Sequence, residues 1–228
     1  MEGWLLDAPL FRDRCDAGRQ LLRVLPPELG RETIVVGLAR GGVQVGAEVA
    51  TALDAALDVV AVRKVRHPYQ PEYALGAVTP DGAGVYFHSY EGLTDAQVAR
   101  AVEEARYEAR ELDLRLHEVH PQLERSGRHV VLVDDGLATG ATMIAAARWA
   151  KSGHAAQVVA AVPVAARQSV EQVAAEVDLL FCPHVRPDLI AVGIWYADFS
   201  AVSDSDVLRL LDEAAERPHV EALTQQDD

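Results

Sequence analysis

Residues 130–142 have the sequence VVLVDDGLATGAT, in which four apolar residues lead into two adjacent carboxylates, Asp134 and Asp135, and then into a turn of small residues. A short, β-branched apolar run bounded by a glycine turn is typical of a strand buried on both faces, as in a parallel sheet. A helix cap beside a surface charge would be a simpler explanation of the two aspartates. A ligand site is favoured, because the acid pair, the glycine turn and two threonines coincide after one buried strand. The segment therefore predicts a parallel α/β fold with a ligand site at this strand end.

Strands and helices alternate along the rest of the chain. Residues 33–38 form another β-branched run, followed by a glycine-containing turn and a helical stretch to residue 53, which is half of a βαβ unit. The other predicted strands are residues 58–63, 74–78, 85–88, 157–162 and 177–181, of which 74–78 and 85–88 are joined by a hairpin turn. The other predicted helices are residues 94–119, 141–151, 167–176 and 204–216. This alternation predicts an open, mostly parallel sheet with helices on both faces.

The length of 228 residues predicts one α/β domain with additions. The first 30 residues contain an amphipathic helical segment over residues 10–25, and residues 217–228 are expected to form a flexible tail. Residues 64–73 carry prolines and mixed charge, which predicts an exposed loop. In the helix predicted over residues 94–119, apolar residues recur at alternating steps of four and three. This spacing leaves two alternatives, a coiled-coil partner or packing onto the sheet or a dimer neighbour.

The formal net charge of −14 bears on which partners the protein binds. Such a surface repels phosphate backbones and anionic membranes, so nucleic-acid binding is not expected without a local basic patch. The two cysteines, Cys15 and Cys182, do not support a disulfide framework, and the sequence shows neither a signal-peptide pattern nor a membrane-spanning apolar run. We therefore expect a cytoplasmic protein.

The turn after the acid pair predicts an anion site. Its small residues free a run of backbone N–H groups at the start of a helix, where the helix dipole favours negative charge, and Thr139 and Thr142 add hydroxyl donors. The nucleotide-binding motifs GxxxxGK[ST] and GxGxxG do not occur in the sequence. Because two carboxylates beside a phosphate would repel it, their natural partners are sugar hydroxyls on the same ligand. A ribose 5-phosphate meets both requirements.

The segment VVLVDDGLATGAT resembles the phosphoribosyl pyrophosphate (PRPP) signature of the type I phosphoribosyltransferase family. The resemblance covers most of the chain and is greatest to a bacterial group with GLARGG after the first strand and RKVRHPYQPEYALGAV after the second. It implies a parallel sheet with flanking helices, Mg²⁺ as cofactor, and PRPP and a small-molecule acceptor as substrates. It also implies a small C-terminal hood, for which residues 177–216 are the candidates, a place in nucleotide metabolism, and a homodimer.

The resemblance further implies a role for each matching residue. Asp134 and Asp135 would bind the ribose hydroxyls and, through PRPP and water, the metal ion. The turn over residues 39–42 matches the pyrophosphate loop, in which the family often has a non-proline cis peptide bond, and residues 64–73 match a mobile loop that closes over pyrophosphate. Ala138 replaces a Thr or Ser of many members, which removes a hydroxyl and leaves the amides. The matching residues are Ala138, Thr139, Gly140, Ala141 and Thr142 for the 5-phosphate, Ala39, Arg40, Gly41 and Gly42 for pyrophosphate, and Lys64, Arg66 and Glu72 in the mobile loop.

The implied reaction is displacement of pyrophosphate from ribose C1 by a nitrogen nucleophile, through an oxocarbenium-like transition state. Arg40, Lys64 and Arg66 would stabilise the charge that grows on pyrophosphate, and Glu72 is a candidate general base. In the hood, the aromatic residues Trp195, Tyr196 and Phe199 offer stacking surfaces, with core packing as the alternative for the first two. Two other functions stay open: a regulator of the same fold that senses PRPP or a nucleotide, and a hydrolase or phosphorylase that acts on phosphorylated ribose.

Overall fold

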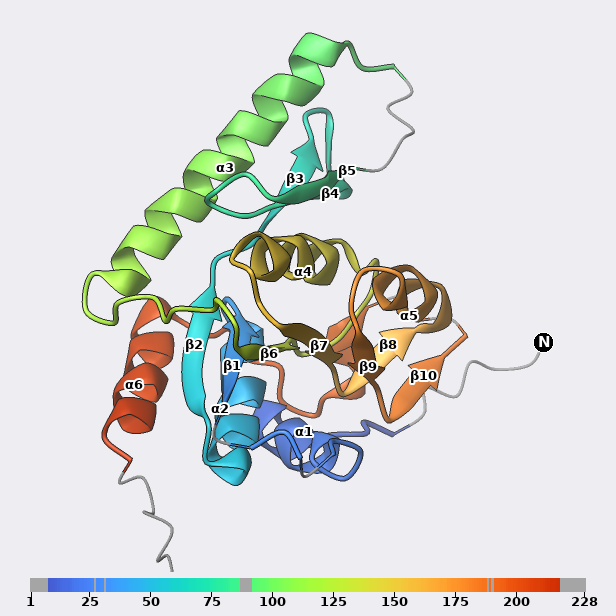
Figure 1. The fold of residues 1–228 in the computed structure, drawn as a ribbon. Coiled ribbons are helices and arrows are strands. Elements are labelled where there is room, and N and C mark those ends of the chain that lie inside the picture. The colour runs from blue at the N-terminus through green and yellow to red at the C-terminus, as the bar shows by residue number, and fades with distance from the viewer. Residues whose placement is uncertain are drawn as a thin grey trace, which may run out of the picture.

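The main sheet of the protein consists of five parallel strands in the order β2-β1-β6-β7-β9 (Figure 1). The computed structural model describes residues 8–26, 28–30, 32–86, 92–187, 189 and 191–217. The strands are β1 (Thr33–Leu38), β2 (Ala56–Val60), β6 (His129–Val133), β7 (Gln157–Ala161) and β9 (Leu179–Phe181). The predicted α/β class with a mostly parallel sheet is therefore confirmed.

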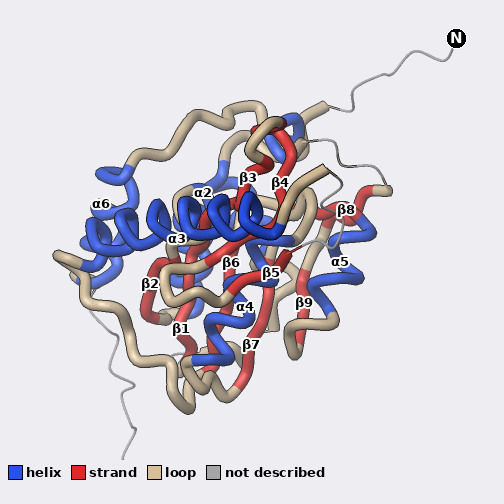
Figure 2. The backbone as a smooth tube through the Cα atoms, turned by 90° about the horizontal axis from the view of Figure 1, so that it is seen from above, coloured by secondary structure: helices blue, strands red, loops and turns tan. Residues whose placement is uncertain are grey.

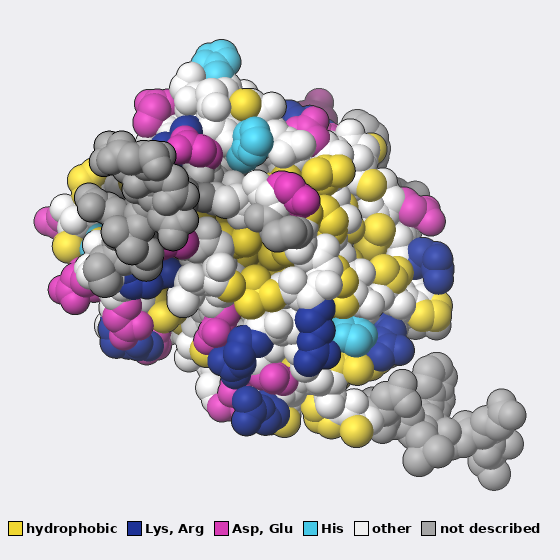
Figure 3. Space-filling view, turned by 60° about the horizontal axis from the view of Figure 1, so that its bottom comes forward, with side chains coloured by type: hydrophobic (Ala, Val, Ile, Leu, Met, Phe, Trp, Pro, Cys, Tyr) yellow, Lys and Arg dark blue, Asp and Glu magenta, His cyan; other side chains and the backbone are white. Residues whose placement is uncertain are grey.

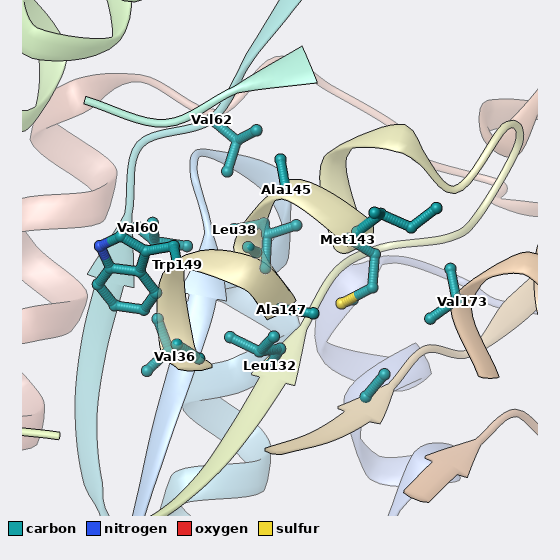
Figure 4. Packing of buried hydrophobic residues seen from close by; sticks show 14 of the residues in the cluster. Val36, Leu38, Val60, Val62, Leu132, Met143, Ala145, Ala147, Trp149 and Val173 are labelled. Atoms are coloured by element: carbon teal, nitrogen blue, oxygen red, sulfur yellow. The ribbon is translucent and has the colours of Figure 1, made fainter. Parts of the chain in front are cut away.

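Helices cover both faces of this sheet because its strands are apolar on both sides. Val36 and Leu38 of β1 and Leu132 of β6 lie on the face of the sheet that packs against one helix, which contributes Met143, Ala147 and Trp149 (Figure 4). The alternate residues of the same strands pack against helices on the opposite face. The first face carries α4 (Ala141–Ser152) and α5 (Arg167–Ala174), and the second carries α1 (Arg14–Leu21), α2 (Gly41–Leu53) and α6 (Asp204–Ala215).

A second, antiparallel sheet has the order β3-β4-β5 and comprises β3 (Arg63–His67), β4 (Gln70–Val78) and β5 (Gly84–Tyr86). The prediction of an exposed loop over residues 64–73 is wrong, because these residues form most of the β3–β4 hairpin. The physical reason is that burial alternates from residue to residue, as in a strand with one buried face. Val65 is buried, whereas its neighbours Lys64 and Arg66 are exposed. The prolines that indicated a loop lie at the turn and in β4.

The long helix α3 (Asp95–His117) packs onto this second sheet and lies over β3 and β4 when seen from above (Figure 2). Its N-terminus is capped by Thr94, whose side chain accepts from Gln97 N while Gln97 reaches back to the Thr94 backbone. The apolar contacts join Val65 and Leu75 of the hairpin to Ala101 and Ala105 of the helix. Of the two alternatives for this helix, packing onto a sheet is therefore found.

The C-terminal part is divided between the main sheet and smaller elements. The strand β9 joins the main sheet, whereas β8 (Val164–Ala166) and β10 (His184–Arg186) form a separate parallel pair followed by the 3₁₀ helix η1 (Val192–Trp195). Helix α6 lies beside β2 and α2 (Figure 1). The tail is predicted over residues 217–228, of which residues 218–228 lie outside the described part of the chain. Within the described part of the chain, no helix is both long and apolar enough to span a membrane.

Candidate functional site

The acid pair lies at the carboxyl end of β6, where parallel sheets commonly bind ligands. Asp134 Oδ1 accepts a hydrogen bond from Asp135 N at 2.9 Å, and Asp134 Oδ2 lies 3.4 Å from Thr142 Oγ1, which donates to it. Burial raises the pKa of the Asp134 carboxyl well above its usual range, and the charge of Asp135 raises it further. The two carboxyl groups therefore lie side by side at the carboxyl end of the sheet. Burial and their mutual repulsion disfavour their charged forms.

Two cations offset part of this effect. Burial also raises the pKa of Asp135, but Arg14 and then Lys64 act in the opposite direction. Arg14 Nε donates to Asp135 Oδ2 at 2.9 Å, and the side chains are only 8% and 15% exposed. Lys64 favours the charged form of Asp134 as well. The structure therefore brings Lys64, one of the predicted phosphate cations, into the electrostatic field of the acid pair.

The small-residue turn after the pair is anchored from two sides. Leu137 N donates to Val164 O at 3.0 Å, which joins the turn to β8. Buried Ser169 of α5 donates from its hydroxyl to Ala138 O at 2.6 Å. Gly140 has a φ of 75°, the left-handed conformation that favours glycine, and is the N-cap of α4. These contacts give the turn before α4 a defined shape. The first N–H groups of α4 lie at the end of this turn, where they could donate to an anion.

The turn after β1 lies directly against the acid pair. The Ala39–Arg40 peptide bond is cis, as the family resemblance implies. A Cβ atom at Gly41 would overlap the Asp135 carboxylate, and one at Gly42 would overlap Val133 O. Only glycine at these two positions lets the start of α2 approach the end of β6 this closely.

Arg40 is held by a residue that sequence analysis missed. Its Nε donates to Asp204 Oδ1 at 2.6 Å, and the second oxygen of Asp204 accepts from Arg115 Nε at 3.1 Å. Burial lowers the pKa of nearby Arg63, and the positive charge of Arg40 lowers it further. No local sequence pattern signals Asp204, because it lies 164 residues from Arg40 in the chain.

The hairpin residues line a groove of about 530 Å³ between β3 and α3. Lys64 and Arg66 come from the hairpin, Arg100 comes from α3, and Tyr69 Oη accepts a hydrogen bond from Gln97 Nε2 at 2.6 Å. The lining is of mixed charge, because α3 also contributes Glu104 and Glu108, and Arg100 pairs with Glu104 at 2.8 Å. Glu72 falls within β4, but its side chain is outside the described part of the structure.

The three aromatic residues of the predicted hood differ in exposure. Trp195 and Tyr196 are 9% and 4% exposed, whereas Phe199 is 37% exposed. Tyr196 donates its hydroxyl to Asp135 O at 2.6 Å, and burial followed by the charge of Asp135 raises its pKa. Among these three, Phe199 presents the most surface to a ligand, while Tyr196 supports the backbone of the acid pair.

A family model described as phosphoribosyl transferase domain matches residues 28–194. Two proteins of Mycobacterium tuberculosis, from strains CDC 1551 / Oshkosh and ATCC 25618 / H37Rv, carry the name "Putative phosphoribosyl transferase" and are 42% identical to the chain over 210 residues. These matches cover 90% of this chain and 47% of each relative, so the chain spans about half the length of the curated relatives it matches. The crystal structure of TT1426 from Thermus thermophilus is 43% identical with a TM-score of 0.74, covering 89% of this chain and 98% of that one. Since the family model matches most of its residues, the chain belongs to the phosphoribosyl transferase domain family.

Proposed function

We propose that the protein transfers the phosphoribosyl group of PRPP to a nitrogenous base or related small molecule and releases pyrophosphate, with Mg²⁺ as cofactor. The observation that carries the proposal is the direct contact between two strand-end turns. Gly41, in the turn with the cis peptide bond, lies against Asp135, which begins the small-residue turn. A single ligand bound at this junction would meet both turns at once.

Each part of PRPP has a matching group at the junction. Asp134 and Asp135 would accept hydrogen bonds from adjacent ribose hydroxyls, which are donors that two carboxylates need. The N–H groups of residues 138–142, together with the hydroxyls of Thr139 and Thr142, would bind the 5-phosphate. The N–H groups of residues 39–42 would bind pyrophosphate. Arg40, Lys64 and Arg66 would supply positive charge.

The donor set at the acid pair suits Mg²⁺. This ion prefers oxygen ligands and is commonly held by one or two carboxylates together with substrate phosphates and water. Among the described residues no group of three or more His, Cys, Asp and Glu side chains has the arrangement of a protein-only metal site. Asp134 and Asp135 would therefore hold the ion indirectly, through PRPP and water. The ion neutralises the charge of pyrophosphate when bound.

The residues of the chain would then act on the bond between ribose C1 and pyrophosphate. As this bond breaks, its electron pair leaves with pyrophosphate, and Arg40, Lys64 and Arg66 stabilise the growing negative charge. The acceptor nitrogen forms the new bond to C1 and loses its proton to a base, for which we propose Glu72. The β3–β4 hairpin, which carries Lys64 and Arg66, would exclude water that otherwise attacks the oxocarbenium ion.

The acceptor would lie on the side of the acid pair that carries Phe199. This residue is 37% exposed, although Gly193 packs against one part of its ring and Arg14 lies over the ring. On the face shown in Figure 3, Lys and Arg side chains lie beside Asp and Glu side chains and apolar surface. Mixed charge of this kind, with the net charge of −14, supports a small-molecule acceptor over nucleic acid.

Pyrophosphate release from PRPP tests the proposal, measured with Mg²⁺ and a panel of purine, pyrimidine and related bases. We expect turnover with at least one acceptor and its loss on adding a chelator. Asp134→Asn and Asp135→Asn are each expected to lower kcat/KM by at least about 100-fold, because each removes a carboxyl oxygen that would accept from the ribose. Asp212→Asn, an exposed carboxylate of α6, is the matched control and should behave as the wild type.

Two other results, from PRPP binding and from analysis of the reaction products, would contradict the proposed transferase activity. PRPP binding without turnover on any base would instead support a sensor of PRPP or a nucleotide. Ribose 5-phosphate formed from PRPP without an acceptor would support a hydrolase.

We further propose that the protein is a cytoplasmic homodimer. The exposed Tyr107 and Leu114 of α3, seven residues apart on one side of the helix, support a partner on that face. Sedimentation of the wild type against a Leu114→Glu variant tests this state. A monomer at every concentration would contradict it.

A further inference from the structure

Arg14 makes three different contacts with one guanidinium group. Its Nε donates to Asp135 Oδ2 at 2.9 Å, and its Nη1 donates to Ser200 O at 2.8 Å. Its Cζ atom lies 3.8 Å from the centroid of the Phe199 ring, in the geometry of a cation–π interaction. The side chain is 8% exposed, so these contacts hold it in one place.

Two of these contacts belong to different parts of the proposed substrate site. Asp135 lies at the ribose, and Phe199 lies at the acceptor. The pyrophosphate loop is also close, because a Cβ atom at Gly41 would lie 2.9 Å from Arg14 Nε. Arg14, Phe199 and Ser200 all lie outside residues 28–194, the part of the chain that matches the family model. The Arg14 side chain thus joins the N-terminal segment to both the acid pair and the C-terminal segment.

We propose that Arg14 is a positioning residue that orients the Asp135 carboxylate toward the ribose and fixes the Phe199 ring beside it. The inference rests on the proposed transferase function. Tyr196 already fixes the backbone of Asp135 through its carbonyl oxygen, so Arg14 supplies what is missing, a fixed side chain. Charge alone does not explain the arrangement, because a Lys ammonium lacks the planar group that pairs at its edge and stacks on its face.

Arg14→Met tests the role by separating substrate binding from folding. We expect the Kd for PRPP with Mg²⁺, measured by calorimetry, to rise at least tenfold, and the KM of the acceptor to rise as well. A merely structural role would lower kcat and the melting temperature and leave both constants unchanged. Arg19→Met is the matched control on the same helix, since its exposed pair with Glu48 should not affect binding.

A double variant shows whether Arg14 acts through Asp135. If it does, Arg14→Met combined with Asp135→Asn binds PRPP no more weakly than Asp135→Asn alone. Fully additive losses in the double variant would overturn the inference. Arg14→Lys keeps the charge, and we expect its Kd to rise about threefold, since it restores one contact of three. If Arg14→Met melts below the assay temperature, Arg14→Lys tests the positioning role instead. A Kd of Arg14→Lys equal to that of the wild type would contradict this role.

The outcomes for the proposed function and for Arg14 are distinct. Absence of PRPP binding by the wild type would overturn the proposed function and, with it, this inference. Wild-type binding together with an unchanged Kd in Arg14→Met would overturn the inference alone.

Discussion

The Nε atom of Arg40 lies 2.6 Å from Oδ1 of Asp204, and this ion pair joins the turn after β1 to the first residue of α6. The other carboxylate oxygen of Asp204 accepts from Arg115 at 3.1 Å. One carboxylate therefore orients the arginine of the proposed pyrophosphate loop and holds it against α3. Because the pair engages Nε, the two terminal nitrogens of Arg40 can still donate to a phosphate.

Asp204→Asn tests this orienting effect. The variant is expected to lower kcat/KM for PRPP by up to about fivefold, because a partly exposed ion pair contributes about 1 kcal/mol or less. Asp212→Asn, which lies in the same helix and pairs with His120, should leave kcat/KM unchanged. An increase in activity would instead mean that Asp204 competes with pyrophosphate for Arg40.

Gly41→Ala tests the contact between the two turns. The new methyl group would overlap the Asp135 carboxylate, so we expect loss of PRPP binding and a free energy of unfolding lowered by about 1 to 3 kcal/mol. Gly46→Ala in the same helix is the control, because its Cβ would meet Val35 Cγ1 at an ordinary 3.5 Å. That change should keep binding and raise stability by about 0.5 to 1 kcal/mol through helix propensity. Equal binding by the two variants would show that the close approach at Gly41 is unimportant.

Ser169→Ala tests the support of the 5-phosphate loop. Removing the hydroxyl leaves Ala138 O without this donor, and one such hydrogen bond contributes about 1 kcal/mol. We expect the Kd for ribose 5-phosphate to rise about fivefold, as measured by calorimetry. Ser152→Ala also removes a hydroxyl that donates to a backbone carbonyl, that of Trp149, but it lies at the far end of α4. The same rise in both variants would exclude a specific role for Ser169.

His117 gives stability a defined pH dependence. Burial disfavours its charged form, but the bonds to Asp113 and Asp58 outweigh burial and raise its pKa from 6.5 to about 9. Its Nε2 lies 3.3 Å from Asp58 Oδ1. Because the folded pKa is the higher one, the stabilisation is complete below about pH 6.5 and is lost as the pH rises through about 9.

Urea unfolding of the wild type and His117→Gln over this range checks the prediction. The stability advantage of the wild type is expected to fall by about 3 kcal/mol from pH 6 to pH 10. His129→Gln, at an exposed position at the start of β6, should follow the wild type. A constant difference between wild type and His117→Gln would show that folding does not shift the pKa of His117.

Several elements followed from neighbouring residues alone. The strand and turn over residues 130–142 and the helix after it were predictable, because apolar runs, glycine turns and helix starts are encoded within a few positions. The hairpin of β3 and β4 was not, although Lys64, Val65 and Arg66 alternate as a strand requires. The prolines indicated a loop, and an alternation of only three residues was too short to indicate a strand instead. The packing of Val65 against α3 favours the strand in the folded protein.

The sequence by itself determined the class of the fold and the family, and it indicated the acid pair as the candidate site. These properties depend on sequence patterns a few residues long. Such patterns can be recognised without knowing how the rest of the chain folds. Only the tertiary structure decided which residues support that site, namely Arg14, Ser169, Tyr196 and Asp204. Each acts on a residue at least 31 positions away in sequence. The partner of a charged or hydroxyl side chain is set by which distant segments the packed sheet brings together, and that choice leaves no trace in the residues beside it.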